Sequence, residues 1–399
     1  MSERMKYKLL WIGAISWCKA GKYEPPVRYP GIVSASSFQQ AIIEGLEKQG
    51  ESVQILSDAD IFDGDRALWK HNENEQCDIR VAGKGNKILR LPVKTSNLIR
   101  EIRKSNLAEN RDVALAYEIH IPYLFALKEL KKRNPSITTL LICPDLTTYM
   151  DIDIDRKPLK KIFKSMENRL MKRLLRYVDG YVFFTEQMAD FFTGKSRRPY
   201  AVVEGVLNDE KYDYSESEKS PFIMHSGSLH SKMGIEELVA AFEELENLKM
   251  NLLFFGSGEM DDFIRQEAQK DARIKHMGFV TPQELFLYEK RAALLVNVRS
   301  PKEEYTKYSF PSKTFEFMAS GSPVLSTDMQ GIPSEYKKYM IVIPDNGKDT
   351  IKEALVTFFS MPESEQIELG KRARSFVRTE KNAIMQSRKI RNLINLLKG

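Results

Sequence analysis

Residues 309–321 read Ser309-Phe310-Pro311-Ser312-Lys313-Thr314-Phe315-Glu316-Phe317-Met318-Ala319-Ser320-Gly321, and Pro323-Val324-Leu325-Ser326-Thr327 follows almost at once. Proline lacks an N–H group and is tolerated where a helix begins, whereas glycine readily ends one. The stretch therefore predicts a short helix from Pro311 to Ser320 and then a buried strand. Helix and strand in this order indicate an open parallel sheet, with the helix start at the edge where ligands bind.

The first turn of this predicted helix suits an anion. Its unpaired backbone N–H groups, the hydroxyls of Ser309 and Ser312 and the ammonium of Lys313 together fit a phosphate or diphosphate. Glu316 lies about one turn further in, where a carboxylate can accept hydrogen bonds from ribose hydroxyls. An amphipathic helix with a solvated glutamate explains the same residues when they are taken alone.

The pattern resembles the donor-binding signature of family-4 (group 1) glycosyltransferases, which are retaining enzymes of the GT-B fold. A second segment is similar to the same family's Ser-Gly-Ser-Leu, Lys, Gly-Ile pattern; it reads Ser226-Gly227-Ser228-Leu229-His230-Ser231-Lys232-Met233-Gly234-Ile235. The resemblance is most specific in the C-terminal half. It implies an α/β protein with two Rossmann-like domains facing a cleft, the second domain binding a nucleotide sugar and the first an acceptor.

The resemblance also implies roles for single residues. Lys232 and Lys313 would neutralise the leaving diphosphate, and Glu316 would orient the ribose. The implied donor-binding residues are Gly227, Ser228, Lys232, Gly278, Val280, Ser309, Pro311, Ser312, Lys313 and Glu316. Among its departures from the family, Ser228 replaces an arginine, Tyr308 a second glutamate, and Cys143-Pro144-Asp145 the usual histidine.

Asp145 completes the predicted catalytic set of Glu316, Lys232 and Asp145. It follows a predicted strand, Ile137–Cys143, at the ligand-facing edge of the first sheet. Its carboxylate can take a hydrogen bond from an acceptor hydroxyl, or it can cap the turn after Pro144, and both interpretations stay open.

Chain length and pattern predict the domain organisation. The 399 residues exceed the usual range of a single core, so two domains are expected. Alternating strand and helix patterns assign residues 1–207 to an N-terminal Rossmann-like domain, and the polar residues 208–220 to a linker. Residues 221–380 form the predicted nucleotide-sugar domain. By resemblance, residues 381–399 form a helix that packs back on the first domain.

Three peripheral segments carry further predictions. A long loop, 14–31, follows the first strand, and loops of this length often act as lids or binding surfaces. Residues 78–91 contain the turn Gly83-Lys84-Gly85-Asn86 between two short runs, which predicts a β-hairpin. Residues 363–397 predict a long helical tail.

Composition excludes several classes of protein. No apolar run reaches the length of a membrane-spanning helix, and the start does not read as a signal peptide, so a cytoplasmic protein is expected. Cys18, Cys77 and Cys143 are widely spaced and predict neither a disulfide nor a zinc site. The histidines and acids give no positive sign of a metal, so no metal or cofactor is expected. The net charge of +6 is modest for this length and does not favour nucleic acid.

Residues 156–177 hold the sharpest charge asymmetry. Nine basic residues face the single acid Glu167, and apolar residues recur at helical spacing. A basic amphipathic helix can lie on anionic lipid at the inner face of a membrane. A domain helix with a core-facing apolar stripe and solvated charges fits equally well, and the two interpretations stay open.

These features predict a glycosyltransferase that moves a sugar from a UDP- or GDP-sugar to a hydroxyl of a glycan or lipid-linked acceptor. By resemblance, the configuration is retained and the product belongs to a surface polysaccharide. Two alternatives remain: a nucleotide-sugar epimerase or hydrolase of the same architecture, and a non-catalytic glycosyltransferase-like subunit.

Overall fold

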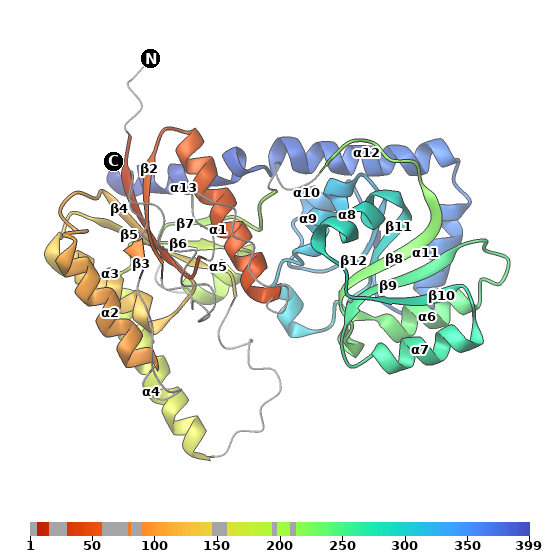
Figure 1. The fold of residues 1–399 in the computed structure, drawn as a ribbon, viewed down its shortest axis with the longest axis horizontal. Helices are drawn as coiled ribbons and strands as arrows, with labels where there is room; N and C mark the ends of the chain where they lie inside the picture. Colours follow the sequence, from red (N-terminus) through yellow and green to blue (C-terminus); the bar gives the residue numbers. More distant parts are fainter. Residues whose placement is uncertain are drawn as a thin grey trace. The chain divides into compact units, whose positions relative to one another are not determined.

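The computed structural model describes residues 6–15, 30–57, 79–80, 90–145, 158–193, 198–207 and 213–399. The chain divides into two compact units, each described here by itself (Figure 1). Unit 1 comprises Met1–Glu204 with Ala383–Gly399, and unit 2 comprises Gly205–Asn382.

Unit 1 is a seven-stranded parallel sheet with helices around it. In spatial order the strands are β3 (Ile79–Arg80), β2 (Ser52–Ser57), β1 (Lys8–Gly13), β4 (Val113–Tyr117), β5 (Thr138–Cys143), β6 (Gly180–Phe183) and β7 (Tyr200–Val202). The helices are α1 (Pro30–Lys48), α2 (Arg90–Lys104), α3 (Ile121–Arg133), α4 (Pro158–Leu174), α5 (Glu186–Thr193) and α13 (Ala383–Lys398). Every residue of β4, β5 and β6 is buried, as expected for parallel strands covered on both faces.

The C-terminal helix α13 packs on α1. A Cβ atom on Gly45 would lie 2.2 Å from the carbonyl oxygen of Ala383, so only glycine allows this approach. The buried carboxylate of Glu51 accepts hydrogen bonds from Arg391 Nε and from the Tyr7 backbone N–H, both at 2.5 Å. The last helix is therefore tied to the first strand of unit 1.

Unit 2 is a six-stranded parallel sheet. In spatial order its strands are β10 (Ile274–Gly278), β9 (Asn251–Ser257), β8 (Ser220–Ser228), β11 (Ala292–Asn297), β12 (Val324–Thr327) and β13 (Ile341–Ile343). Its helices are α6 (Ile235–Glu243), α7 (Asp261–Lys270), α8 (Pro282–Arg291), α9 (Lys313–Ser320), α10 (Ser334–Lys337), α11 (Lys348–Phe359) and α12 (Glu363–Glu380). The central strands run outward from β8 in both directions, which is the doubly wound order of a Rossmann-like fold.

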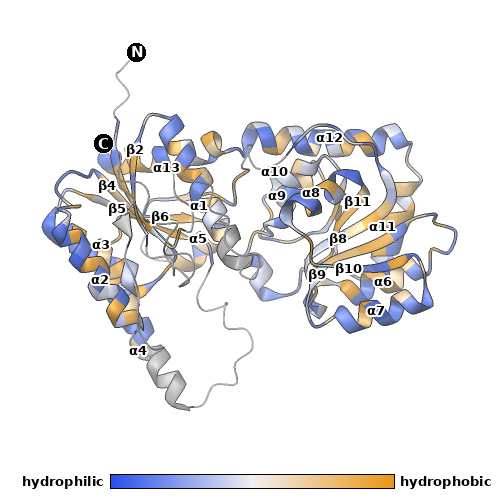
Figure 2. Ribbon diagram, in the orientation of Figure 1, coloured by the Kyte–Doolittle hydropathy of each residue, from blue (hydrophilic) through white to orange (hydrophobic). Residues whose placement is uncertain are grey.

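Two apolar clusters cover the two faces of this sheet. One contains Phe317 of α9, Tyr336 of α10 and Phe376 of α12. The other contains Phe242 of α6 and Phe358 of α11. Figure 2 shows the strands largely in hydrophobic colours and the outer sides of the helices in hydrophilic ones. The predicted α/β class with two Rossmann-like domains is confirmed.

Several local predictions need correction. The hairpin predicted at 78–91 disagrees with the part of it that is described, because β3 pairs in parallel with β2 and α2 begins at Arg90, while residues 81–89 lie outside the description. The helical tail consists of two helices, α12 and α13, and α13 (Ala383–Lys398) corresponds to the separate C-terminal helix expected at 381–399. Strand β8 already begins at Ser220, inside the predicted linker, of which residues 208–212 lie outside the description.

Other predictions fall where the chain is not described. These are most of the loop 14–31, the cysteines Cys18 and Cys77, and the start of the basic segment at 156–157; in α4 the side chains are described from Met166 onward. Cys143 is buried as a free thiol. In the described part of the chain, no helix is both long and apolar enough to cross a membrane.

Candidate active site

The ends of β8 and β9 approach each other through two glycines. Gly227 and Gly256 are paired in the sheet and have φ angles of +134° and +123°. A Cβ atom on Gly256 would lie 1.8 Å from the carbonyl oxygen of Gly227, so this close approach requires glycine. A Cβ atom on Gly227 would meet nothing within 4 Å, so the backbone before Ser228 borders open space.

Helix α9 begins at Lys313, two residues later than predicted. Pro311 and Ser312 form a turn instead, because their carbonyl oxygens accept from the N–H groups of Thr314 (2.8 Å) and Phe315 (3.2 Å). No side chain caps this helix start. The ring of Phe315 packs 5.0 Å from that of Phe310, which anchors the turn in the core.

A buried charge cluster joins α9 to the end of β8. The Glu289 carboxylate, on α8, accepts a hydrogen bond from the Ser226 hydroxyl (3.1 Å) and pairs with the Lys313 ammonium (3.3 Å). Lys313 also pairs with Glu316 one turn further along α9. The side chain of Glu289 is 1% exposed, against 35% for Glu316. The two predicted donor segments are thus connected through Glu289, a residue that the sequence interpretation missed.

The charges in this cluster perturb one another. Burial raises the pKa of Glu289 to about 7, a rise that Lys313 opposes and Glu316 reinforces. Burial lowers the pKa of Lys313, but Glu289 and Glu316 outweigh it, so that the net shift is upward. Lys313 therefore stays protonated at neutral pH, whereas Glu289 can gain or lose a proton there.

Buried polar atoms without a hydrogen-bond partner gather near this cluster. Among the described residues they include Asn297 Nδ2 at the end of β11, and Arg299 Nε and the Tyr305 hydroxyl in the segment that follows. Buried polar atoms are normally paired. Their convergence at the carboxyl edge of the sheet indicates a place for a polar ligand.

The pKa of His225 depends on the burial and the charges at this edge of the sheet. Its Nδ1 atom lies 3.2 Å from the Val296 carbonyl oxygen, to which it donates. Burial is the main cause that lowers the pKa of His225 to about 4, and the cations of Arg299 and Lys313 contribute. The imidazole is therefore neutral, and both cations lie within electrostatic range of it.

The other predicted donor residues border the same sheet edge. Lys232 is exposed on a short helical turn, Ser231–Met233, and makes no ion pair with a described residue. Gly278 ends β10 with φ of +71°, and a Cβ atom there would meet nothing within 4 Å. Val280 packs on the core just before α8. Ser309 is half-buried and Ser312 is exposed.

Asp145 belongs to unit 1, where a second carboxylate, that of Glu118, interacts with it. Glu118 follows β4 with φ of +84°, a backbone conformation uncommon for a residue with a side chain. Its N–H group donates to the carbonyl oxygen of Ile142 on β5 at 2.8 Å. Burial raises the pKa of Glu118; Lys94 opposes this rise and Asp145 adds to it. The two carboxylates therefore interact at the carboxyl edge of the first sheet.

Comparison with known proteins identifies the second unit. Residues 220–360 match the family model described as glycosyl transferases group 1. The comparison with curated proteins finds no match.

Solved structures resemble the whole chain. A sucrose-phosphate synthase from Thermosynechococcus elongatus has 15% identity and a TM-score of 0.64, with 98% of this chain and 99% of that chain covered. HepE of Anabaena, in complex with UDP, has 12% identity and a TM-score of 0.66, with 98% and 100% covered. The lipopolysaccharide outer core galactosyltransferase WaaB, in its apo form, has 12% identity and a TM-score of 0.62, with 98% and 99% covered. The chain therefore has the two-domain GT-B fold, and residues 220–360 match a group 1 glycosyltransferase domain, which supports a transferase.

Proposed function

We propose that the protein transfers a sugar from a UDP- or GDP-sugar to a hydroxyl of a glycan or lipid-linked acceptor, with retention of configuration. The observation that carries the proposal is the cationic and incompletely hydrogen-bonded edge around Lys313, Asn297 and Arg299, inside the matched domain. An anionic, hydroxyl-rich donor supplies the hydrogen-bond partners that these buried groups lack.

Lys313 is the first candidate to neutralise the leaving diphosphate. It stands at the uncapped start of α9, so its ammonium and the first N–H groups of the helix act on the same anion. Charge stabilisation of this kind lowers the barrier to departure of the diphosphate. Lys232 follows β8 in the sequence and is exposed, so its ammonium can add a second point charge.

Arg299 compensates for the arginine that the chain lacks at Ser228. It follows β11, its Nε atom is buried without a hydrogen-bond partner, and it forms no ion pair with a described carboxylate. Burial lowers its pKa. A half-buried guanidinium whose buried Nε lacks a partner and which has no carboxylate beside it calls for an anionic ligand, and a diphosphate is the anion that the proposed donor brings.

The remaining roles follow from position. Half-exposed Glu316 orients the ribose, and the backbone at Gly278–Val280 borders the base. Asp145, with Glu118, takes the acceptor hydroxyl in unit 1. The proposal requires no metal or cofactor, because lysine and arginine side chains balance the diphosphate charge.

Two relatives support the choice of substrates. HepE was solved with UDP, which favours a uridine nucleotide as donor. WaaB acts in the lipopolysaccharide outer core by its name, which favours a surface polysaccharide as product. We place the reaction in the cytoplasm, with contact to the inner face of the membrane through the predicted helix at 156–177.

Melting curves with UDP, GDP and their sugars test the proposal. One nucleotide should stabilise the chain, by about 2.7 kcal/mol at a hundred times its dissociation constant. Glu316→Ala should lose most of that shift, whereas Glu353→Ala, which changes an exposed glutamate on α11, should keep it. If no nucleotide stabilises the chain, the donor site is refuted.

Incubation with the stabilising nucleotide's sugars separates the alternatives. Sugar release or isomerisation without an acceptor would favour the epimerase or hydrolase. Binding without turnover in the presence of glycan and lipid-linked acceptors would favour a non-catalytic subunit. The anomeric configuration of a product, read by nuclear magnetic resonance, tests retention.

A further inference from the structure

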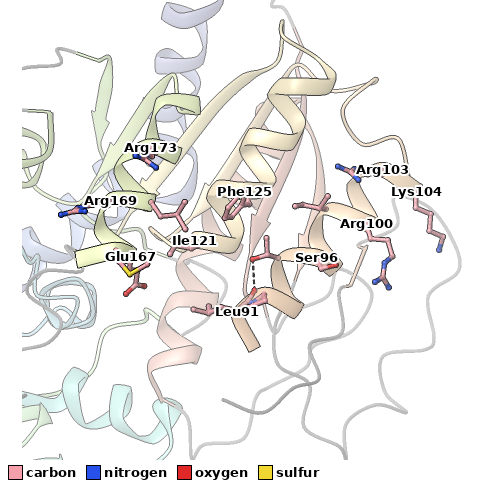
Figure 3. A pocket seen from close by; sticks show the side chains of 15 residues that line it. Leu91, Ser96, Arg100, Arg103, Lys104, Ile121, Phe125, Glu167, Arg169 and Arg173 are labelled. Carbon is pink, nitrogen blue, oxygen red and sulfur yellow. Dashed lines mark hydrogen bonds between the residues drawn. The ribbon is translucent and has the colours of Figure 1, made fainter. Parts of the chain in front are cut away.

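Basic side chains usually stay at the surface of a protein. Figure 3 shows two of this kind, Arg169 and Arg173, which are exposed beside a groove between α2, α3 and α4 of unit 1. Lys219, one residue before β8 in unit 2, is half-buried instead. A lysine held partly away from water needs hydrogen-bond partners for its ammonium.

The ammonium of Lys219 bridges the C-terminal ends of α8 and α9. It donates to the carbonyl oxygen of Lys290 at 2.7 Å, near the end of α8, and to that of Gly321 at 3.2 Å, where α9 ends. Its third hydrogen bond goes to the Ser322 hydroxyl at 2.6 Å. These partners use all three donors of the ammonium. The last carbonyl groups of a helix have no partner within the helix, and a cation is favoured there.

The same bridge reaches the main chain of Glu289. The Ser322 hydroxyl accepts from Lys219 and donates to the Glu289 carbonyl oxygen at 2.6 Å. Glu289 is the buried carboxylate that contacts Ser226 and Lys313. Lys219 is therefore two hydrogen bonds away from the residue that connects the two donor segments.

The segment that carries Lys219 is attached to unit 2 on both sides. Asp213 pairs with Lys290 of α8 at 3.1 Å, and Glu216 pairs with Arg374 of α12 at 3.3 Å. These contacts hold the chain before β8 against α8 and α12. The position of the Lys219 ammonium is thus fixed by its own hydrogen bonds and by those of its neighbours.

We propose that Lys219 is a positioning residue of the donor site, which joins the C-terminal ends of α8 and α9 and so holds Glu289 against Lys313. One side chain of this ion pair comes from each helix, so a shift of α8 against α9 changes the 3.3 Å contact between them. The consequence for donor binding rests on the proposed function, whereas the effect on Glu289 does not. A merely structural cation would stabilise unit 2 and leave the charge cluster as it is.

The pH dependence of unfolding tests the effect on Glu289 without any nucleotide. The charges that shift the pKa of Glu289 are those of Lys313 and Glu316, so a changed pKa in Lys219→Met reports a changed position. Burial is the main cause that raises this pKa, and a displaced carboxylate meets more water. We therefore expect it to fall from about 7 toward its ordinary value of 4.5.

Urea unfolding, followed by hydrogen exchange in peptides of unit 2, measures this change. Between these two pH values, the free energy of unfolding should fall less steeply with rising pH in Lys219→Met than in the unaltered chain. Burial is the main cause that lowers the pKa of Lys219 to about 8, so its own titration lies above this window. A variant that is less stable by the same amount at every pH would overturn the proposal.

Calorimetry with UDP tests the effect on the donor. Lys219→Met should weaken UDP binding by about tenfold, because a displaced Lys313 loses part of a charge-assisted contact. Lys219→Arg keeps donors for the carbonyl oxygens and should restore most of the affinity. Unaltered affinity in Lys219→Met would overturn the proposal. If the unaltered chain binds no nucleotide, the proposed function fails, and the pH dependence still decides the role of Lys219.

Ser322→Ala tests the same bridge with a smaller change. It removes the hydroxyl between Lys219 and Glu289, so it should weaken UDP binding in the same direction. Added to Lys219→Met it should have little further effect, because both residues act through one chain of hydrogen bonds. Fully independent effects of the two substitutions would contradict this chain.

Arg273→Met is a matched control on the other face of the sheet. Arg273 is 24% exposed, and its Nη1 donates to the carbonyl oxygen of Leu245, just after α6, at 2.7 Å. Its guanidinium lies 4.6 Å from the centre of the Phe242 ring. The control should also destabilise unit 2, but it should keep the pH dependence and the UDP affinity of the unaltered chain. Equal changes in both variants would overturn the proposal, because a general loosening of unit 2 would then explain them.

Discussion

Glu289→Gln removes one negative charge from the centre of the candidate site while keeping the shape of the side chain. In the unaltered chain, the buried carboxylate accepts from Ser226 at 3.1 Å and contacts the Lys313 ammonium at 3.3 Å. An amide oxygen can accept from both groups. We therefore expect the variant to fold and to report mainly on the charge.

The magnitude follows from the pKa. Burial raises the pKa of Glu289 from 4.5 to about 7, a rise of about 2.5 that corresponds to about 3 kcal/mol. Between these two values the folded chain holds a proton that the unfolded chain has lost. The free energy of unfolding therefore falls as pH rises through this window, and the loss is complete above pH 7. The variant has no such proton and should lack this part of the pH dependence.

Urea unfolding followed by pulsed hydrogen exchange measures the difference. The three tryptophans, Trp11, Trp17 and Trp69, precede residue 205, so fluorescence would not report on unit 2 and its peptides must be followed directly. From about pH 5 to 8, Glu289→Gln should gain roughly 3 kcal/mol relative to the unaltered chain. For Glu353→Gln on α11, the difference in the free energy of unfolding from the unaltered chain should not change with pH. If the difference for Glu289→Gln also does not change with pH, the reasoning is refuted.

Three further substitutions have expected outcomes. Arg299→Gln should weaken UDP binding by about tenfold or more in calorimetry, since a charge-assisted contact is lost, and unchanged affinity would exclude Arg299 from the site. Gly256→Ala should lower both the melting temperature and UDP affinity, because its Cβ would lie 1.8 Å from the Gly227 carbonyl oxygen; a variant as stable as the original would contradict this. Glu316→Gln should bind inorganic diphosphate about fivefold more tightly and UDP more weakly, because it frees Lys313 while losing the ribose contact. Parallel changes for both ligands would contradict these separate roles.

The strands and most helices could be predicted because their apolar patterns are long and regular. Residues 137–143 read as a buried strand, and β5 occupies Thr138–Cys143 with every residue buried. The short strand β3 lies within the first run of the predicted hairpin, but its parallel pairing with β2 could not be predicted, because β2 precedes it across a long polar segment. A Gly-Lys-Gly-Asn turn nearby pointed to a hairpin instead.

The site was predicted in part. The segments containing Gly227 and Lys313 were identified by their resemblance to a family pattern, and the structure joins them. Glu289 was missed because an acid in an amphipathic helix usually faces solvent. Its spacing of three from buried Phe286 was the available signal, since that spacing places both residues on one face of α8. The positive φ of Glu118 could not be predicted, because the residue that usually adopts it is glycine and this position holds a glutamate.

Donor binding in this site would exchange partners rather than add them. In the free chain, Lys313 and Glu316 neutralise each other. A nucleotide sugar offers its diphosphate to the lysine and its ribose hydroxyls to the glutamate, so each charge leaves one partner for another. Half-exposed ion pairs contribute only about 0–1 kcal/mol, and charge-assisted hydrogen bonds to a bound ligand are stronger. Glu289 is buried beyond contact with the donor and would stay on Lys313 throughout, so that the lysine remains in place when Glu316 turns to the ribose.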